Sequence, residues 1–319
     1  MKKSILSLLM VVLALTTAVA QESQTEYNFL RLPVSAHAAA LGGDNITIIE
    51  DDASLMFGNP ALLASVSDRT LNLNFMTYMA GAVTGSASFS RVASEKASWG
   101  VMAQYMNYGK MKETDENNVE TGEFSAQEIA LAGAFSYTLA KNLVGGITAR
   151  LITSYIGGYN SMAAGIDLGL NYYDPEREWS VSAVAKNLGG QIKAYDDEFG
   201  RMPLDVQLGV TKRFENMPFR LSLTAVDLTH WNYNAINHLV AGVDLMLGDQ
   251  FYVSGGYNFL RAKEMKIAEG SGEEADESSH GAGLSFGAGI QMERFKLQVG
   301  YAKYHVSSSS IVVNVSLEI

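Results

Sequence analysis

Residues 128–139 read EIALAGAFSYTL, in which Ile129, Leu131, Phe135 and Tyr137 occupy alternate positions. Small or polar residues fill most of the positions between them. Successive side chains of a β-strand point to opposite faces, so this stretch predicts a strand with one apolar and one polar face. A single segment of this kind is weak evidence, because any half-buried strand has the same pattern.

The same period-two pattern recurs from residue 70 to the end of the chain. Segments of about 10 residues with alternating hydrophobicity, separated by turns, are typical of transmembrane barrels. The pattern predicts fourteen strands, at roughly residues 70–80, 83–93, 97–107, 125–139, 142–156, 160–173, 176–188, 202–214, 217–229, 237–248, 250–261, 283–291, 293–304 and 309–319.

The lengths of the connections favour a membrane barrel. Every connection after an even-numbered strand is short, whereas the long ones, 108–124, 189–201, 230–236 and 262–282, follow odd-numbered strands. Outer-membrane barrels have short periplasmic turns and long outer loops. A soluble β-sandwich or propeller is the alternative, and it does not predict long loops at one end only. We therefore expect an all-β, fourteen-stranded antiparallel transmembrane β-barrel, multi-pass in a bacterial outer membrane, with both chain ends on the periplasmic side.

The first twenty residues predict export. Lys2 and Lys3 precede the apolar run Ile5–Leu15, and Ala18 and Ala20 form a small-residue cleavage site. This arrangement is typical of a secretory signal peptide, and the apolar run is short of the about 20 residues that a spanning helix needs. The formal net charge of −11 argues against a nucleic-acid partner, because such a partner requires a basic face.

The segment before the first strand has a different pattern, with small helix formers and helix-start signals. Asn59 is a good N-cap and Pro60 suits the first helical position. Asp51 and Asp52 are paired carboxylates that could bind calcium, but such a pair more often caps a helix. A compact, partly helical segment of this size fits inside a wide barrel as a plug. The predicted divisions are a signal peptide at 1–20, an N-terminal luminal plug at 21–69 and the barrel at 70–319.

The plug contains an ordered set of short motifs, formed by Leu41, Gly42 and Gly43, then Asp51 and Asp52, then Asn59, Pro60 and Ala61, and this set resembles that of a known family. The chain is similar to the PorV/PorQ proteins of the type IX secretion system, and to their PorQ branch in particular, which are relatives of the FadL transporters. The resemblance implies a FadL-like barrel in a cell-surface attachment complex. It implies outer-membrane lipid or lipopolysaccharide, a surface protein of PorZ type and a PorU–PorV module as partners.

Charged residues inside the strands predict a polar lumen. A charge that faces lipid near the membrane midplane costs roughly 2–4 kcal/mol, so these side chains should mostly point inward. We expect them to pair with one another and with Asp44, Glu50, Asp51 or Asp52 of the plug; solvated charges in a wet lumen are the alternative. The predicted luminal charge network comprises Arg150, Asp167, Asp205, Arg220 and Asp244.

Motifs for enzyme chemistry are lacking in the sequence. The five histidines are scattered, none has metal-ligand spacing with another, and the chain contains no cysteine. We therefore predict no catalytic residue, no metal site and no cofactor.

Three functions fit these features. The first is a non-enzymatic scaffold that holds a surface partner. The second is a FadL-like carrier of a hydrophobic or lipid ligand, for which Leu55, Met56, Phe57, Leu62 and Leu63 would either line a pocket or anchor the plug. The third is an open porin, against which the plug and the acidic loops argue. The loop residues expected to bind a partner are Glu113, Asp115, Glu116, Asp196, Asp197, Trp231, Tyr233, Glu264, Glu273 and Glu274.

Overall fold

The computed structural model describes residues 25–319 except residues 216, 232, 249, 266, 270–275, 279–280 and 306–307. The predicted signal peptide lies outside the described residues. No helix within the described part is long and apolar enough to cross a membrane.

The predicted barrel is confirmed. Within the described residues, fourteen antiparallel strands close into one barrel, in which β1 pairs with both β2 and β16. A separate two-stranded sheet is inserted between β11 and β14. The barrel strands are β1 (Thr70–Thr77), β2 (Val83–Ser94), β3 (Ala97–Thr114), β4 (Glu120–Ala140), β5 (Leu143–Ile156), β6 (Tyr159–Asp174), β7 (Trp179–Lys193), β8 (Asp205–Arg213), β9 (Phe219–Ala225), β10 (Leu239–Leu247), β11 (Phe251–Asn258), β14 (Leu284–Gln291), β15 (Phe295–His305) and β16 (Ser308–Glu318).

The two faces of each strand have the polarity that the alternation predicts. In β6, Asp167 and Asn171 are buried inside the barrel, whereas Leu168 and Leu170 on the outer face are 47% and 43% exposed. The same contrast recurs around the wall, for example with Leu131 and Leu151 outside and Ser154 inside. An apolar outer band and a polar interior are the arrangement of a barrel that spans a membrane.

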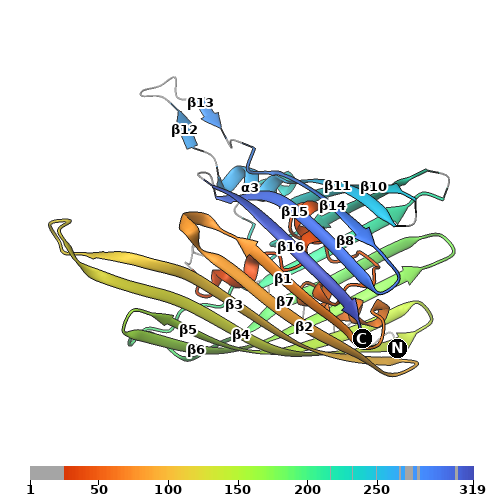
Figure 1. Cartoon of the computed structure of the whole chain (residues 1–319), viewed down its shortest axis with the longest axis horizontal. Coiled ribbons are helices and arrows are strands. Elements are labelled where there is room, and N and C mark those ends of the chain that lie inside the picture. The colour runs from red at the N-terminus through yellow and green to blue at the C-terminus, as the bar shows by residue number, and fades with distance from the viewer. Residues whose placement is uncertain are drawn as a thin grey trace.

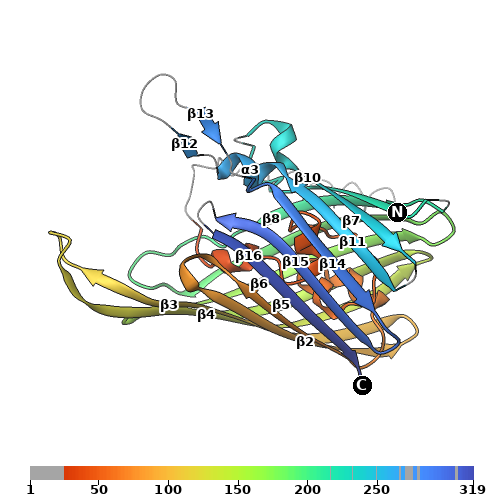
Figure 2. The same cartoon turned by 45° about the horizontal axis from the view of Figure 1, so that its top comes forward.

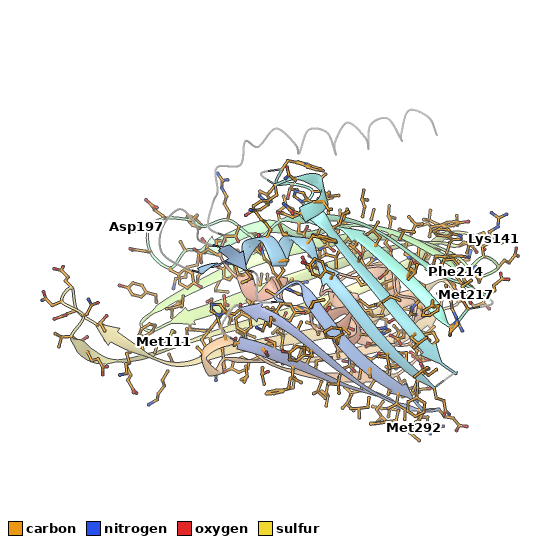
Figure 3. All side chains as sticks on the ribbon, turned by 90° about the horizontal axis from the view of Figure 1, so that it is seen from above. Met111, Lys141, Asp197, Phe214, Met217 and Met292 are labelled. Carbon is orange, nitrogen blue, oxygen red and sulfur yellow. The ribbon has the colours of Figure 1, made fainter. Side chains whose placement is uncertain are left out.

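The strand connections separate by length, as predicted. Figure 3 shows the short-turn residues Lys141, Phe214 and Met292 at one end of the barrel, and Met111 and Asp197 at the opposite end. We call these the short-turn end and the long-loop end. The helix α3 (Phe259–Glu264) and the small hairpin of β12 (Ile267–Glu269) and β13 (Asp276–Ser278) also lie at the long-loop end (Figure 1).

One predicted loop is mostly strand. The expected loop 108–124 forms a hairpin, because β3 continues to Thr114 and β4 begins at Glu120. This hairpin projects beyond the other strands in Figures 1 and 2. Neither neighbouring strand accompanies it: β2 pairs with β3 only as far as Asn107, and β5 pairs with β4 only from Ala126. Two other strand connections contain short helical turns instead, η5 (Met79–Gly81) and η6 (Ala235–His238).

Residues 25–69 lie within the barrel, and we call them the plug. Their short helical turns are η2 (Asn28–Arg31), α2 (Ala36–Ala40), η3 (Ala53–Phe57) and η4 (Pro60–Ser65), drawn in red and orange between the strands in Figure 1. Most of the apolar core lies where the plug meets the wall. In one cluster, Met56 and Leu63 of the plug pack with Met102 of β3 and Ala134 of β4.

The plug runs along the barrel from one end to the other. Thr25 forms a bridge with Arg201 of the β7–β8 connection, at the long-loop end. At the other limit, Asp68 accepts hydrogen bonds from Arg91 and from the backbone N–H of Val92 beside a short turn. Both ends of the barrel therefore lie at the short-turn end, as expected, whereas the described start of the plug lies at the long-loop end; the N-terminal end of the chain lies outside the described residues.

Candidate functional site

The plug turns are stabilised by the capping residues that the sequence indicates. Asp52 caps η3 by accepting from the backbone N–H of Ser54, and Asn59 caps η4 by accepting from Ala61. Pro60 occupies the start of η4, where its fixed φ suits a helix and no N–H is needed. These contacts support the capping role of Asp52 over a calcium role.

Glycines of the barrel wall make room for the plug motif. A Cβ at Gly146 of β5 would collide with the backbone of Pro60 and Ala61, and one at Gly169 of β6 would collide with the Asn59 amide oxygen. The plug backbone therefore approaches the wall more closely than any larger residue would allow.

A second close approach between plug backbone and wall glycine involves Leu41, Gly42 and Gly43. Leu41 is buried, and a Cβ at Gly256 of β11 would collide with its backbone. Gly42 and Gly43 both adopt positive φ, at 108° and 103°, which other residues rarely tolerate. The chain turns sharply here as α2 ends.

Apolar plug residues anchor the plug rather than line an open pocket. Leu55 and Leu62 pack with Leu41 and Ile48, and Phe57 packs beside Met56 and Leu63. The cavity that Leu55 and Phe57 help to line has a volume of only about 50 Å³. This volume holds no more than a few water molecules.

The two carboxylates of the Asp51-Asp52 pair bond to different partners. Asp51 accepts from the backbone N–H and hydroxyl of Ser67, within the plug. Asp52 accepts from the Asn72 amide of β1 at 2.9 Å. Of these two residues, Asp52 is therefore the one whose side chain links the plug to the wall in the described structure.

A cluster of buried charges joins the plug to the wall around His37, which sits in α2. The ring Nδ1 lies 2.9 Å from Glu50 Oε2, and Nε2 lies 2.8 Å from Asp244 Oδ1 of β10. Asp244 also accepts from Arg220 Nε of β9 at 2.7 Å, and Lys296 Nζ of β15 lies 3.5 Å from Glu50 Oε1. The His37 ring stacks on Tyr252 with ring centroids 4.0 Å apart. We call these residues the His37 cluster.

The electrostatics of this cluster favour a charged His37. Burial lowers the pKa of this plug residue, but the carboxylates of Glu50 and Asp244 outweigh burial and raise the pKa to about 9. For Glu50, burial raises the pKa, and the nearby cations Lys296 and His37 more than reverse this, leaving it well below the usual range.

The predicted luminal charges divide into three groups. Arg220 and Asp244 belong to the His37 cluster. Arg150 bonds to Asp167 at 2.6 Å within the wall and makes no ion pair with the plug among the described residues. Asp205 lies 3.8 Å from Lys186, whose ammonium is also 3.9 Å from Asp44 of the plug, forming a looser third group.

The Arg150–Asp167 pair supports an irregularity in the wall. The register of β6 against β7 shifts between Ile166 and Leu168, and Asn187 opposite has a positive φ of 60°. The Asn187 backbone N–H donates to Asp167 Oδ1 at 2.7 Å, so the carboxylate replaces a missing ladder bond. This bulge lies in the outer half of β7, where β8 no longer pairs with it.

An apolar groove crosses the outer wall near this bulge. It has a volume of about 900 Å³ and is open to the surroundings of the barrel. Large outward side chains such as Leu131 and Leu151 border it, with smaller residues between them. Its lining includes Ala103, Gly133, Ala149, Ala164, Leu188 and Gly189.

A second cavity, of about 500 Å³, opens at the long-loop end of the lumen. Leu30 and Leu32 of the plug line it together with Lys186 and Asn187 of β7. We call this cavity the vestibule. Consecutive residues of β7 therefore line the two spaces: Asn187 lines the vestibule and Leu188 lines the outer groove.

Those residues expected to bind a surface partner that the structure describes lie at the long-loop end but do not form one site. Glu113, Asp115 and Glu116 are exposed on the projecting hairpin. Asp196 and Asp197 lie in the β7–β8 connection, and Figure 3 shows Asp197 at the end of the barrel opposite the short turns. Trp231 is exposed and its ring packs on His238, and Tyr233 lies nearby in the sequence. Glu264 ends α3. Glu273 and Glu274 lie outside the described residues.

Two cationic members of the His37 cluster were not predicted from the sequence. His37 stands among alanines, and no local pattern indicates that it meets Asp244, which is far away in the sequence. Lys296 could have been found, because it shares the inward register of β15 with Gln298. In the described part of the chain no group of three His, Cys, Asp or Glu residues is arranged to hold a metal ion.

Comparison with known proteins shows the fold. No family model and no curated protein matches the chain. Among solved structures, a Pseudomonas aeruginosa FadL homologue is similar with a TM-score of 0.53 and 12% identity, over 89% of this chain and 98% of that one. The Pseudomonas putida toluene transporter TodX has a TM-score of 0.56 and 14% identity, over 88% and 96%. The Ralstonia pickettii toluene transporter TbuX has a TM-score of 0.54 and 12% identity, over 90% and 96%. The chain therefore has the FadL-like fold of an outer-membrane β-barrel and crosses the membrane with the fourteen strands described above.

Proposed function

We propose that the chain is a carrier for a small hydrophobic ligand at the outer membrane. The observation that carries this proposal is that the luminal vestibule and the apolar outer groove lie on either side of the wall at the β7 bulge, lined by the consecutive residues Asn187 and Leu188. The fold adds support, because structures with the same fold are named as toluene transporters. The seated plug argues against an open diffusion porin, since its side chains pack directly against the wall.

The groove suits an apolar ligand for a physical reason. Its lining is almost wholly hydrocarbon, so a ligand that passes to it from the water of the vestibule gains about 25 cal/mol for each Å² of apolar surface that leaves water. The small residues along it leave space that larger side chains would fill. Arg150 lines both the groove and the small luminal cavity, and Asp167 holds its side chain in place. Only the thickness of the barrel wall therefore separates the two spaces here.

Filling the groove tests this proposal. A Cβ at Gly133 meets nothing within 4 Å, so Gly133→Trp can occupy the groove without disturbing the wall. Gly255 on the outer face of β11 lies away from the groove, and its Cβ would make only ordinary contacts, so Gly255→Trp is the matched control. The assay measures uptake of radiolabelled toluene and of a radiolabelled long-chain fatty acid by expressing cells.

We expect uptake of one probe to depend on the chain, to fall in Gly133→Trp and to persist in Gly255→Trp. Uptake no greater than in cells lacking the chain, or equal loss in both variants, would contradict the carrier proposal.

We propose a second candidate, anchoring of a surface protein of PorZ type, because of the projecting β3–β4 hairpin. The hairpin extends past the barrel with both edges free and with Glu113, Asp115 and Glu116 exposed. The plug motif that resembles the PorQ branch adds to this candidate, and the PorU–PorV module and lipopolysaccharide remain the partners that this resemblance implies.

Shortening the hairpin separates the two candidates. Replacement of residues 112–123 by a tight Asn-Gly turn joins the paired residues Met111 and Phe124 and keeps the β3–β4 pairing within the wall. Pull-down from native outer membranes should lose the surface partner if the hairpin binds it, while deletion of residues 196–199 serves as the loop control. Full retention of the partner after hairpin shortening would exclude this binding site.

A further inference from the structure

The centre of the lumen contains an arrangement that neither candidate function requires. His37 of the plug lies between two carboxylates, Glu50 of the plug and Asp244 of the wall. We propose that protonated His37 acts as a clamp: it holds the plug against the barrel wall, and the loss of its proton releases the plug.

The geometry indicates a doubly protonated ring. Both ring nitrogens lie within hydrogen-bond distance of carboxylate oxygens, at 2.9 Å and 2.8 Å. An ionised carboxylate only accepts hydrogen bonds, so both nitrogens must donate, and only the imidazolium does this. A neutral ring would turn a nitrogen lone pair toward a buried carboxylate.

One contact offers an alternative for a neutral ring. Arg220 Nη2 lies 3.3 Å from Nε2 and could donate to it. However, Arg220 already donates through Nε to Asp244 at the shorter distance of 2.7 Å. The shorter contact of Nε2 itself is with Asp244, which favours the imidazolium.

Charged groups of both the plug and the wall surround the ring. Glu50 and Asp244 lie beside the cations Lys296 and Arg220, whereas Asp52, whose pKa is raised by burial, accepts from the Asn72 amide. A protonated His37 donates to both Glu50 and Asp244, so its buried charge has two partners, and buried charges without a partner are costly. The other groups that face the cluster are neutral: the stacked Tyr252 ring, the Ser254 hydroxyl bonded to Asp244 and the Gln298 amide near Glu50.

The position of the ring explains why its protonation matters for the plug. His37 contacts Asp244 on β10, while Glu50 contacts Lys296 on β15. The His37–Glu50 pair therefore connects two parts of the wall through the plug. Without the proton, Asp244 keeps Arg220 as its partner and the plug loses its ionic link to β10.

The expected pH dependence follows from the two states of the histidine. A released plug exposes His37 to water, where its pKa returns to about 6.5. Because the seated pKa is higher, at about 9, the clamp holds fully below the released value and weakens as pH rises toward the seated one. Glu50 has the opposite sign: its contribution holds above its ordinary pKa and fades as the solution becomes strongly acidic.

The test uses the absence of cysteine in the chain. Ala53→Cys places a single thiol at a fully buried plug position, and Glu116→Cys places one on the exposed hairpin. The ratio of their maleimide labelling rates, in the refolded full barrel, removes the intrinsic pH dependence of the thiol. In parallel, nitrogen NMR of histidine-labelled protein reports whether both His37 ring nitrogens carry protons.

We expect the ratio to rise about two-hundredfold between pH 6 and pH 10, and both ring nitrogens to be protonated at pH 7. His37→Gln should give a high ratio at every pH. His238→Gln should behave like the parent, because this second buried histidine bonds only to the Val226 carbonyl in the described structure.

Two results would overturn the clamp. One is an unprotonated ring nitrogen at pH 7, as expected if Nε2 accepts from Arg220. The other is a pH-dependent ratio that survives in His37→Gln. If His37→Gln does not fold, the NMR measurement on the parent still decides, and neither result depends on whether the barrel carries a ligand.

Discussion

Individual wall glycines decide how closely the plug can sit. At Gly169, any side chain would displace Asn59, whose amide caps η4 and donates to the Ile46 carbonyl and the Ser182 hydroxyl. At Gly146, the neighbour is the Pro60 backbone. The Asn-Pro-Ala motif and the wall glycines therefore form one fitted contact, although they are far apart in the sequence.

Gly169→Ala should destabilise the barrel by about 1–3 kcal/mol, because a new methyl group in a packed interior forces its neighbours to shift. Urea unfolding of the refolded protein measures this loss. Gly133→Ala adds the same methyl group where nothing lies within 4 Å and should leave the midpoint almost unchanged. Equal midpoints for the two variants would show that the plug does not rest on Gly169.

Local signals at single residues could be predicted from the sequence, and distant contacts could not. Asn59 and Pro60 indicate a helix start through neighbours a few residues away, and the structure has that start. The role of His37 depends on Asp244, which only barrel closure brings near it. The alternation placed Arg220 and Asp244 on the inner face, but it could not tell which charge each would meet.

At the scale of elements, alternation predicts a strand well wherever one face meets lipid and the other meets the lumen. β6 and β16 match their predicted spans closely for this reason. The upper part of β3 and β4 was expected to be a loop, because Lys112 to Glu123 is polar on both faces. A hairpin that has left the membrane needs no apolar face, so the pattern vanishes although the pairing continues.

The hairpin should be cut by protease while the barrel stays intact. Its cross-strand pairs, Lys110–Glu123 and Lys112–Glu120, are exposed and should contribute little to stability. Trypsin should therefore cleave after these lysines in the folded protein, and the nicked chain should keep the gel mobility of a folded barrel until it is heated. Resistance of Lys110 and Lys112 to trypsin would indicate that the hairpin is covered or packed.

At the scale of the whole molecule, the apolar surface of the barrel lies outside and its strand charges lie inside. The plug fills most of the interior. Fold class and the inward charges follow from period-two alternation and the cost of a charge in lipid. The outer groove does not follow from the sequence, because Ala103, Gly133 and Ala149 come together only through the register of three strands.

The central claim is that a seated plug closes the lumen, and single-channel conductance in planar bilayers tests it most directly. The intact barrel should show no steady open-pore current, because plug side chains pack against the wall along the lumen. A chain that lacks residues 25–66 should conduct, since a barrel of this size without its plug encloses water. A steady porin-like current through the intact chain, equal to that of the shortened one, would contradict the account.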